Sequence, residues 1–474
     1  MRDTCIYKET IGEEDYECPR EVGQPESFCN LHNPDLNKNQ HEFAILIERE
    51  LKDQSTPEAD FRGVVFPEIP EILRKGTITK HAVFDHATFR GKAVFDETVF
   101  EQFSSFDHTT FSRGVAFNGV TFKKGCQFLK AKFDGRQISF DRSHFYGVTK
   151  IDATFGDRVS FDGAYFHGDV FFNRSNFSSH SKLTARVFEG IADFTDCSFK
   201  ESVTFGGVEF RGPTTFHFKH LSNGPNFQDT KFLGKTTFAE NIFAGKDLTF
   251  RSCDLSGARV LDLPIVKGKV EFDDCNWPKI RSGLFKLRHC IADEKTQSKS
   301  LSLLQAYRWF HEYYFSKSEF GLASDFYIGF MRAKRKVRKK NLFSKGIDVF
   351  YFLFSQYGES ILRPCFALFL MWLLVPAILL TLGVKLDPGK NAPEVYFVWG
   401  EGSCILFLKE YWSTFILNVS LTTLFRTSDL RPPLTSVQHT VLMIETIFNG
   451  LFLAFLGLGI RRTFAPKKPL STTQ

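Results

Sequence analysis

Three cysteines and a histidine near the amino terminus have the residue types and spacing of a metal site. Cys5, Cys18, Cys29 and His32 follow one another in the pattern C-x12-C-x10-C-x2-H. Thiolate and imidazole are ligands that zinc prefers, and the short last gap lets one tight turn present two of them. A polar segment this short cannot bury a useful core, so a bound ion would supply its folding energy. We therefore expect a structural zinc site that uses all four coordination positions; the alternative is a disordered tail with unrelated thiols.

Phenylalanine spacing defines the element that follows this segment. Through the middle of the chain Phe recurs in steps that alternate between five and six residues, so the pattern repeats at every fourth Phe. One column therefore contains Phe84, Phe106 and Phe128. The residue two before each Phe is small or β-branched, as at Ala82 and Thr109, and alternate residues of an extended chain face the same side. A repeat of this length predicts a solenoid whose Phe side chains form the core.

This repeat resembles the pentapeptide-repeat family, with Phe at the central position and one extra residue in every second pentapeptide. The resemblance implies an all-β, right-handed quadrilateral β-helix. From Phe84 to Trp277 we expect roughly nine coils, which make a rod of about 40 Å at ~4.8 Å per coil. One-residue slips at Phe140–Phe145 and from Phe250 onward are interpreted as local bulges. The Cys/His segment also resembles a short amino-terminal segment of some membrane-associated pentapeptide proteins.

Composition and motifs limit the function classes. Between residues 80 and 280 acidic and basic residues nearly balance, and the whole chain carries a net charge of +6. A DNA mimic needs a field of one sign, so topoisomerase binding is a remote alternative. The repeat also lacks a basic stripe with exposed aromatics, so we expect no nucleic-acid partner. His41-Glu42 and His311-Glu312 lack the second histidine of H-E-x-x-H, and no Walker A loop or G-x-S-x-G elbow occurs, so we expect no enzyme activity.

Two segments are long and apolar enough to span a bilayer. The first, residues 364–384, contains no charge, and the second, about 440–460, contains only Glu445 and precedes Arg461-Arg462. The basic run 332–340 precedes the first span; it is either a solvated face or a contact for anionic lipid headgroups. Positive residues flank the outer sides of both spans, so both termini should be cytoplasmic. Ten cysteines without a dense paired framework fit that reducing compartment.

The stretch between the spans carries the functional hypothesis. Residues 403–424 are apolar but interrupted by Lys409 and Glu410, which favours a short re-entrant helix. Span, short helix, loop and span in this order resemble the two-helix pore module of potassium-channel-like proteins. The whole arrangement resembles bacterial pentapeptide proteins that carry such a module, which implies an inner-membrane location. The filter-like positions are Thr422, Thr423, Leu424, Phe425, Arg426 and Asp429. They include no glycine for a permissive filter backbone, and Arg426 adds positive charge, so potassium selectivity does not carry over.

Glu445 and Asn449 stand four apart in sequence, on one face of the second span. Such side chains either line an aqueous path or form an interhelical hydrogen bond. Two spans cannot enclose a pore alone, so both interpretations imply a homo-oligomer, which would be a tetramer if channel-like. The leading hypothesis is an ion-channel-like membrane protein whose cytoplasmic solenoid binds a protein partner or gates the membrane part. The alternative is a non-conducting, membrane-tethered scaffold.

A helix should connect the metal segment to the solenoid and cap the first coil, because an exposed sheet edge would aggregate. We expect Asn33-Pro34-Asp35 to start it, and its apolar positions are Phe43, Leu46, Ile47 and Leu51. The six expected segments are the Cys/His segment (1–32), the capping helix with a first solenoid turn (33–79), the β-helix (80–282), a cytoplasmic helical linker (283–360), the membrane module (361–463) and a carboxy-terminal tail (464–474).

Overall fold

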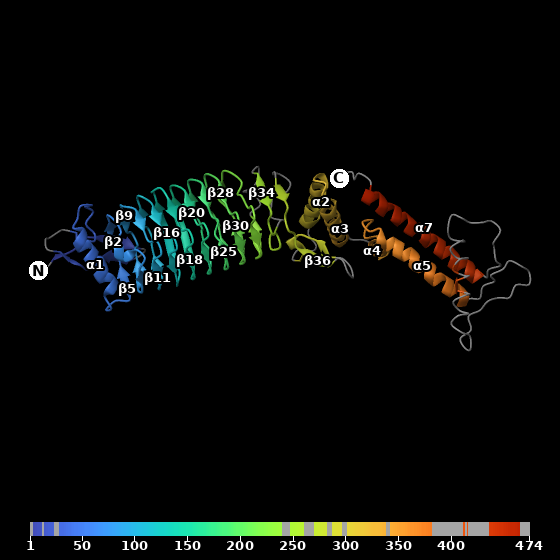
Figure 1. Cartoon of the computed structure of the whole chain (residues 1–474), viewed down its shortest axis with the longest axis horizontal. Coiled ribbons are helices and arrows are strands. Elements are labelled where there is room, and N and C mark those ends of the chain that lie inside the picture. The colour runs from blue at the N-terminus through green and yellow to red at the C-terminus, as the bar shows by residue number, and fades with distance from the viewer. Residues whose placement is uncertain are drawn as a thin grey trace, which may run out of the picture. The chain divides into compact units, whose positions relative to one another are not determined.

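The computed structural model describes residues 3–11, 14–22, 28–238, 247–259, 270–281, 287–295, 301–337, 342–381, 411–412, 415 and 436–464. The chain divides into two compact units, Met1–Ser298 and Lys299–Gln474 (Figure 1). The first unit contains a β-solenoid with its amino-terminal cap. The second contains α-helices joined by turns in its described residues.

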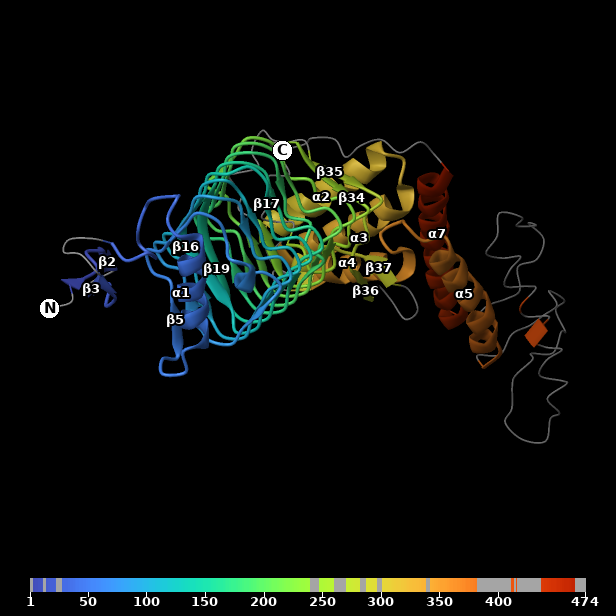
Figure 2. The ribbon, with the colours of Figure 1, turned by 60° about the vertical axis from the view of Figure 1, so that its left-hand side comes forward.

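Short parallel strands build the solenoid, and they stack into four faces because each strand pairs with the strand one coil away. Figure 2 shows these coils obliquely, one behind another. Along one face, for example, Phe100 pairs with Phe122 and Phe122 pairs with Phe145. Another face has nine strands on one continuous path between residues 58 and 238. This path begins before Phe84, where the predicted count of roughly nine coils starts. The four-faced parallel β-solenoid is therefore confirmed.

The four faces are made of the following strands. The first contains β5 (Glu58–Asp60), β8 (His81–Val83), β12 (Ser104–Ser105), β16 (Cys126–Phe133), β19 (Thr149–Phe155), β22 (Val170–Phe171), β26 (Ala192–Asp193), β30 (Thr214–Phe216) and β33 (Thr236–Phe238). The second contains β6 (Val65–Phe66), β9 (Thr88–Phe89), β13 (Thr110–Phe111), parts of β16 and β19, β23 (Asn176–Phe177), β27 (Ser198–Phe199) and β31 (His220–Leu221). The third contains β7 (Thr77–Ile78), β11 (Val99–Phe100), β15 (Thr121–Phe122), β18 (His144–Phe145), β21 (Tyr165–Phe166), β25 (Val187–Phe188), β29 (Glu209–Phe210) and β32 (Lys231–Phe232). The fourth contains β10 (Ala93–Val94), β14 (Val115–Ala116), β17 (Ile138–Ser139), β20 (Val159–Ser160), β24 (Ser181–Lys182) and β28 (Val203–Thr204).

The other elements flank this body. In the first unit they are β1 (Asp3–Thr4), β2 (Lys8–Ile11), β3 (Glu14–Glu17), β4 (Glu21–Val22), α1 (Gln40–Lys52), η1 (Glu71–Leu73), β34 (Leu248–Arg251), β35 (Val270–Asp273), β36 (Lys279–Arg281), β37 (Leu287–His289) and η3 (Ala292–Lys295). In the second unit they are α2 (Leu301–Ser316), α3 (Phe320–Val337), α4 (Leu342–Ser355), α5 (Leu362–Thr381) and α7 (Ser436–Phe464).

Stacked phenylalanine rings fill the interior, as the repeat predicts. Phe84, Phe106 and Phe128 are at most 1% exposed, and successive rings in this column have centroids 4.8 Å apart. That distance equals the usual spacing between paired strands, so each ring lies directly over the ring of the preceding coil. Full burial of one such side chain contributes about 1.5–3 kcal/mol.

The small residue two positions before an inward Phe also has a polar role. Thr109 Oγ1 donates to the Phe84 carbonyl (2.7 Å), and Cys197 Sγ donates to the Phe172 carbonyl (2.8 Å). In both cases the acceptor belongs to the preceding coil. These bonds satisfy hydroxyl and thiol groups that would otherwise be unpaired in an apolar core. The sequence predicted only that these side chains are small.

The slip predicted near Phe140–Phe145 is a real change of register. Phe145 pairs with Phe122, so this coil is one residue longer than the coil that joins Phe100 to Phe122. The pairing of β16 with β19 shifts by one residue between Leu129 and Lys132, because Leu129 pairs with Asp152 whereas Lys132 pairs with Thr154. A β-bulge in β16 therefore compensates for the extra residue. In this coil Phe128 pairs with Ile151, so a buried isoleucine takes the inward position of that Phe column.

One corner of the solenoid allows unusually close contact between coils because it consists of glycines. Gly190, Gly212 and Gly234 occupy the same position in successive coils. A Cβ atom on Gly212 would lie 1.9 Å from the Gly190 carbonyl oxygen, and one on Gly234 would lie 2.1 Å from that of Gly212. Only glycine fits this approach of backbone to backbone.

Helix α1 covers the first coil, but it begins later than the sequence predicted. Phe43 is buried and its ring lies 5.6 Å from that of Phe66. Asn39 is the N-cap, and its side chain accepts from the Glu42 backbone N–H. The expected start at Asn33-Pro34-Asp35 is wrong. Asn33 and Asp35 instead accept hydrogen bonds from the N–H groups two positions on, which holds a turn rather than a helix.

In the second unit, α2 and α3 form a hairpin with an aromatic interface. Phe326 of α3 packs against Phe310 and Tyr314 of α2, with ring centroids 5.2 and 5.5 Å apart. Gly329 faces the Tyr307 ring, which lies 2.4 Å from where a Cβ atom would be. A larger residue at this position would therefore separate the two helices.

Helices α5 and α7 pack side by side and antiparallel. Phe452 in the second half of α7 packs with Leu368 in the first half of α5, whereas Leu379 near the end of α5 packs with Val441 near the start of α7. Both helices are long and apolar enough to cross a membrane, over Leu362–Leu379 and Thr440–Arg461. The expected end of the first span at residue 384 lies outside the described residues.

Candidate metal centre

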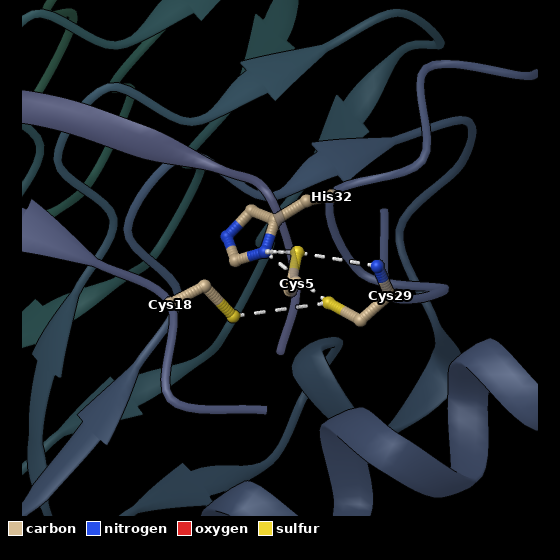
Figure 3. A group of neighbouring side chains, drawn as sticks. All are labelled: Cys5, Cys18, Cys29 and His32. Carbon is tan, nitrogen blue, oxygen red and sulfur yellow. Dashed lines mark hydrogen bonds between the residues drawn. The ribbon is translucent and has the colours of Figure 1, made fainter. Parts of the chain in front are cut away.

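The four predicted ligands come together although they belong to separate parts of the cap. Cys5 follows β1, Cys18 follows β3, and Cys29 and His32 lie in the turn before α1. All four are buried, and their ligand atoms lie within 4.8 Å of one another. Figure 3 shows the three sulfur atoms and the His32 ring turned toward a common centre. The structure thus forms a Cys3His site that could bind a metal ion.

Distances between the ligand atoms fit a tetrahedron. His32 Nδ1 lies 3.2 Å from Cys29 Sγ and 3.6 Å from Cys5 Sγ, and Cys18 Sγ lies 3.9 Å from Cys29 Sγ. Zinc–sulfur bonds of about 2.3 Å in tetrahedral geometry require sulfur atoms about 3.8 Å apart. The thiols are free rather than joined in disulfides, so all remain available as ligands.

The backbone around His32 fixes which ring nitrogen faces the thiols. His32 Nε2 lies 2.8 Å from the Arg62 carbonyl oxygen. A carbonyl only accepts, so Nε2 carries the proton and Nδ1 presents its lone pair to the cysteines. This arrangement is the usual second sphere of a metal-bound histidine. The Tyr7 ring stacks on the imidazole at 4.2 Å and holds it in place.

Local hydrogen bonds hold the cysteines in this arrangement. The Asn33 N–H donates to the Cys29 carbonyl (2.9 Å) and closes the tight turn that presents Cys29 and His32. The Cys29 N–H donates to Cys5 Sγ (3.2 Å). Backbone N–H groups that point at a sulfur stabilise its thiolate form.

The pKa values of the Cys18 and Cys29 thiols shift in opposite directions. Hydrogen bonding with Cys29 lowers the pKa of Cys18 to about 3 against the opposing effect of burial, and His32 adds to the lowering. The pKa of Cys29 is raised, first by its bond to Cys18 and then by burial. Arg20 Nη1 lies 3.8 Å from Cys18 Sγ and favours the thiolate. Thiolate is the form that binds metal.

Lys38 joins the metal turn to the first coil. Its buried ammonium donates to the carbonyl oxygens of Leu31 (3.1 Å), Asn33 (3.2 Å) and Val65 (2.6 Å). Burial lowers the pKa of Lys38 to about 8. The Val65 N–H also donates to the Leu31 carbonyl. The site and the solenoid edge are therefore one hydrogen-bonded structure.

A second connection runs through charged side chains. Arg20 Nη2 donates to Glu50 Oε2 of α1 (2.9 Å) and to the carbonyl of Asp60 in β5 (3.1 Å). Tyr16 of β3 donates to Asp60 Oδ2 (2.9 Å). The sequence analysis missed Lys38, Arg20 and Arg62. Single residues that bond backbone carbonyls leave no spacing signal.

The two polar residues of the second predicted span are buried. Glu445 and Asn449 of α7 are 0% and 3% exposed, one to two turns before Phe452, which packs on α5. Among the described residues, neither amide atom of Asn449 has a hydrogen-bond partner. The filter-like residues at positions 422–426 and 429 lie outside the described residues.

Comparison with known proteins identifies the repeat. Residues 84–132 match the family model described as pentapeptide repeats (9 copies). No curated protein and no solved structure matches the chain. The Cys3His site and both apolar helices lie outside the matched residues. Within them, the inward Phe columns and paired coils agree with the match, so this part of the β-solenoid is built of pentapeptide repeats.

Proposed function

We propose that this protein is a membrane-anchored β-solenoid, in which α5 and α7 cross a bilayer and the solenoid serves as a cytoplasmic interaction domain. The observation that carries the proposal is the apolar surface that α5 and α7 leave exposed. A helix of 20 residues, the length of α5, is about 30 Å long and matches the hydrocarbon thickness of a bilayer.

The exposed side chains on both helices are large and apolar. On α5, Phe366 and Phe369 are 62% and 57% exposed; on α7, Met443 and Ile447 are 60% and 62% exposed. Water-soluble proteins rarely leave contiguous apolar surface of this kind uncovered. Lipid chains would cover it without requiring hydrogen bonds, because the helical backbone satisfies its own polar groups.

Basic residues mark one end of the helix pair. Arg363 lies at the start of α5, and Arg461 lies at the end of α7. Because the helices are antiparallel, both residues belong to the same end, which the positive-inside rule assigns to the cytoplasm. On this basis we propose that both termini lie in the cytoplasm; the bacterial inner-membrane location rests on the family resemblance alone.

The solenoid surface supports a protein partner better than nucleic acid. Charges on neighbouring coils neutralise one another in ion pairs, such as Lys123 with Glu101 (2.9 Å), Arg211 with Glu189 (3.2 Å) and Lys182 with Asp162 (2.9 Å). A surface built this way has no extended field of one sign. We therefore propose a protein partner and no nucleic-acid partner, and we assign no catalytic role.

We further propose that the Cys3His site holds structural zinc. Four ligands fill a tetrahedral shell and leave no open position for substrate. Bound zinc would join β1, β3 and the turn before α1, and so stabilise the cap over the first coil.

Ion conduction is the second candidate function. The unpaired amide of Asn449 favours it, because these atoms retain hydrogen-bonding capacity for water or for another subunit of a homo-oligomer. The burial of Glu445 and Asn449 inside a single helix pair favours the non-conducting scaffold. Recording from purified protein in planar bilayers separates the two candidates.

Alkaline extraction of membranes from cells that express the full chain tests the anchoring. We expect the protein to stay in the pellet, and Phe369→Lys to release it, because a lysine in the hydrocarbon core is costly. Ile45→Lys on α1, where Ile45 is 50% exposed, is the matched control and should stay in the pellet. Extraction of the unaltered protein into the alkaline supernatant would contradict the anchoring.

A further inference from the structure

Three arginine side chains converge on one aromatic ring where the chain enters α5. The guanidinium carbons of Arg332 and Arg335 from α3 and of Arg363 from α5 lie 4.9, 5.8 and 5.5 Å from the Phe352 ring centroid. Each contact is a favourable cation–π interaction. Three like charges around one ring nevertheless repel one another unless an anion lies among them.

The backbone fixes this arrangement. Arg363 Nη1 donates to the carbonyl oxygens of Phe352 (2.9 Å) and Leu353 (3.3 Å) at the end of α4, where a cation also offsets the helix dipole. Gln356, Tyr357 and Gly358 between α4 and α5 all have positive φ, at 51°, 61° and 82°. This sharp turn brings the start of α5 back to Phe352.

Asp348 is a carboxylate that shares the neighbourhood of the cluster. Burial raises the pKa of Tyr357. The positive charges of Arg335 and Arg332 oppose this shift, and the negative charge of Asp348 adds to it. The three charged groups therefore share one neighbourhood with Tyr357. The contacts around Phe352 and Tyr357 thus bring three guanidinium groups and one carboxylate into one neighbourhood. The next carboxylate along the chain, Glu359, accepts a hydrogen bond from Ser324 of α3.

The cluster lies at the edge of the proposed membrane span. Arg363 is the second residue of the apolar segment Leu362–Leu379. On α4, Phe343 and Ile347 are 82% and 54% exposed, as expected for a helix that lies in the interface with its apolar side in lipid. Headgroup phosphates occupy this depth.

We propose that Arg332, Arg335 and Arg363 bind the phosphate of an anionic phospholipid headgroup. The inference rests on the proposed membrane anchoring. Guanidinium groups match phosphate oxygens with paired N–H donors, and the Phe352 ring holds their planes in place. Three guanidinium groups that converge on one ring favour an anionic lipid over a zwitterionic one. Bound lipid would fix α3 and α4 against the start of α5.

Native mass spectrometry of the full-length protein in detergent tests this site. We expect retention of phosphatidylglycerol or cardiolipin but not of phosphatidylcholine. Arg335→Gln should weaken retention roughly fivefold or more, and Arg335→Lys should restore it only in part because lysine lacks the planar fork. Lys336→Gln removes the same charge from the neighbouring exposed residue and should change little.

Three results would overturn the proposal without affecting the membrane anchoring. Equal loss in Arg335→Gln and Lys336→Gln would mean that a diffuse basic surface attracts the lipid. Retention of phosphatidylcholine equal to that of phosphatidylglycerol would mean that the site does not select charge. Displacement of lipid by millimolar glycerol 3-phosphate or inorganic phosphate would assign the site to a soluble phosphate instead. Failure of the membrane anchoring would be seen in a different experiment, the alkaline extraction, as release of the unaltered protein from membranes.

Discussion

His32 donates a hydrogen bond of 2.8 Å from Nε2 to the carbonyl oxygen of Arg62. Arg62 follows β5, the first strand of the solenoid, whereas His32 is the last ligand of the Cys3His site. The bond has two consequences. It turns the Nδ1 lone pair toward the three thiols, and it ties the metal turn to the edge of the sheet. A metal ion at this site would therefore stabilise the cap and the first coil together.

Metal analysis of the purified protein should find about one zinc per chain. Cys29→Ser combined with His32→Ala should abolish binding, since both ligands of the tight turn are lost. Cys365→Ser removes an exposed thiol outside the cap and serves as the control, with zinc retained. Stoichiometric zinc in the double variant would refute the ligand assignment. Chelation of the wild-type protein should lower its melting temperature, because the cap then lacks its stabilising ion.

The solenoid core makes a second prediction through Phe194. This residue is 0% exposed and stacks between Phe172 and Phe216, with centroids 5.1 and 5.3 Å away. Phe194→Asp should collapse the rod, because an unpaired charge buried in an apolar stack costs several kcal/mol. Circular dichroism and thermal melting provide the measurement.

Phe171 offers the matched control for this substitution. It neighbours the core residue Phe172 but is only partly buried, as expected for the outward position of β22. Phe171→Asp should therefore keep native β content and lose little stability. Native stability in Phe194→Asp would show that the inward-Phe model is wrong.

Asp107 makes the fold sensitive to mildly acidic pH. Burial raises the pKa of this carboxyl to about 6, although a hydrogen bond from the Leu129 N–H opposes the shift. The usual pKa is about 3.9, so between pH 4 and 6 the folded chain holds a proton that the unfolded chain has lost. Stability therefore falls as pH rises through this window, and above pH 6 the charged carboxylate remains a constant cost. With solvent screening the effect is on the order of 1 kcal/mol.

Asp107→Asn should remove this pH dependence and raise stability at pH 7. The amide oxygen can still accept from Leu129, and the Gln127 amide, which donates to Asp107 Oδ2 (2.7 Å), can rotate to accept from the new NH2 group. Denaturant titrations at pH 4.5 and pH 7 provide the measurement. Asp96→Asn is the control, since Asp96 accepts the equivalent backbone bond from Asn118 on another face. An unchanged pH profile in Asp107→Asn would contradict this account.

The sequence predicts the solenoid and the metal ligands well for different reasons. Phe columns such as Phe84, Phe106 and Phe128 repeat so often that single slips do not hide the period. The Cys3His ligands are recognisable by residue type and by the short gap from Cys29 to His32. Both signals are local or periodic, so they can be detected without knowledge of tertiary structure.

Features that depend on tertiary contacts could not be predicted in this way. Lys38 bonds three backbone carbonyls, and any lysine in a polar loop looks the same in sequence. The start of α1 depends on whether the Asn33 side chain forms turn hydrogen bonds with the backbone or the segment forms a helix. The convergence of Arg335 and Arg363 on Phe352 joins three helices and follows only from the packed structure.

The α5–α7 helix pair supplies the last prediction, which separates a pore from a scaffold. Asn449 is buried between the helices with both amide atoms unpaired among the described residues. If these atoms face only the helix pair, Asn449→Leu should raise thermal stability, since it removes a buried polar group without a partner. If they face water in an oligomeric path, the same change should reduce or abolish current in planar bilayers.

Glu445→Gln should distinguish the two functions in the same way. It should alter currents in a pore, but it should change mainly oligomer stability in a scaffold. Thr446→Val is the control, because Thr446 is exposed and bonds its own helix at the Leu442 carbonyl. A change of current in Arg426→Gln would also support a pore, because one arginine per subunit would make a ring of charge. Absence of current from correctly assembled protein across voltages would leave the scaffold as the function.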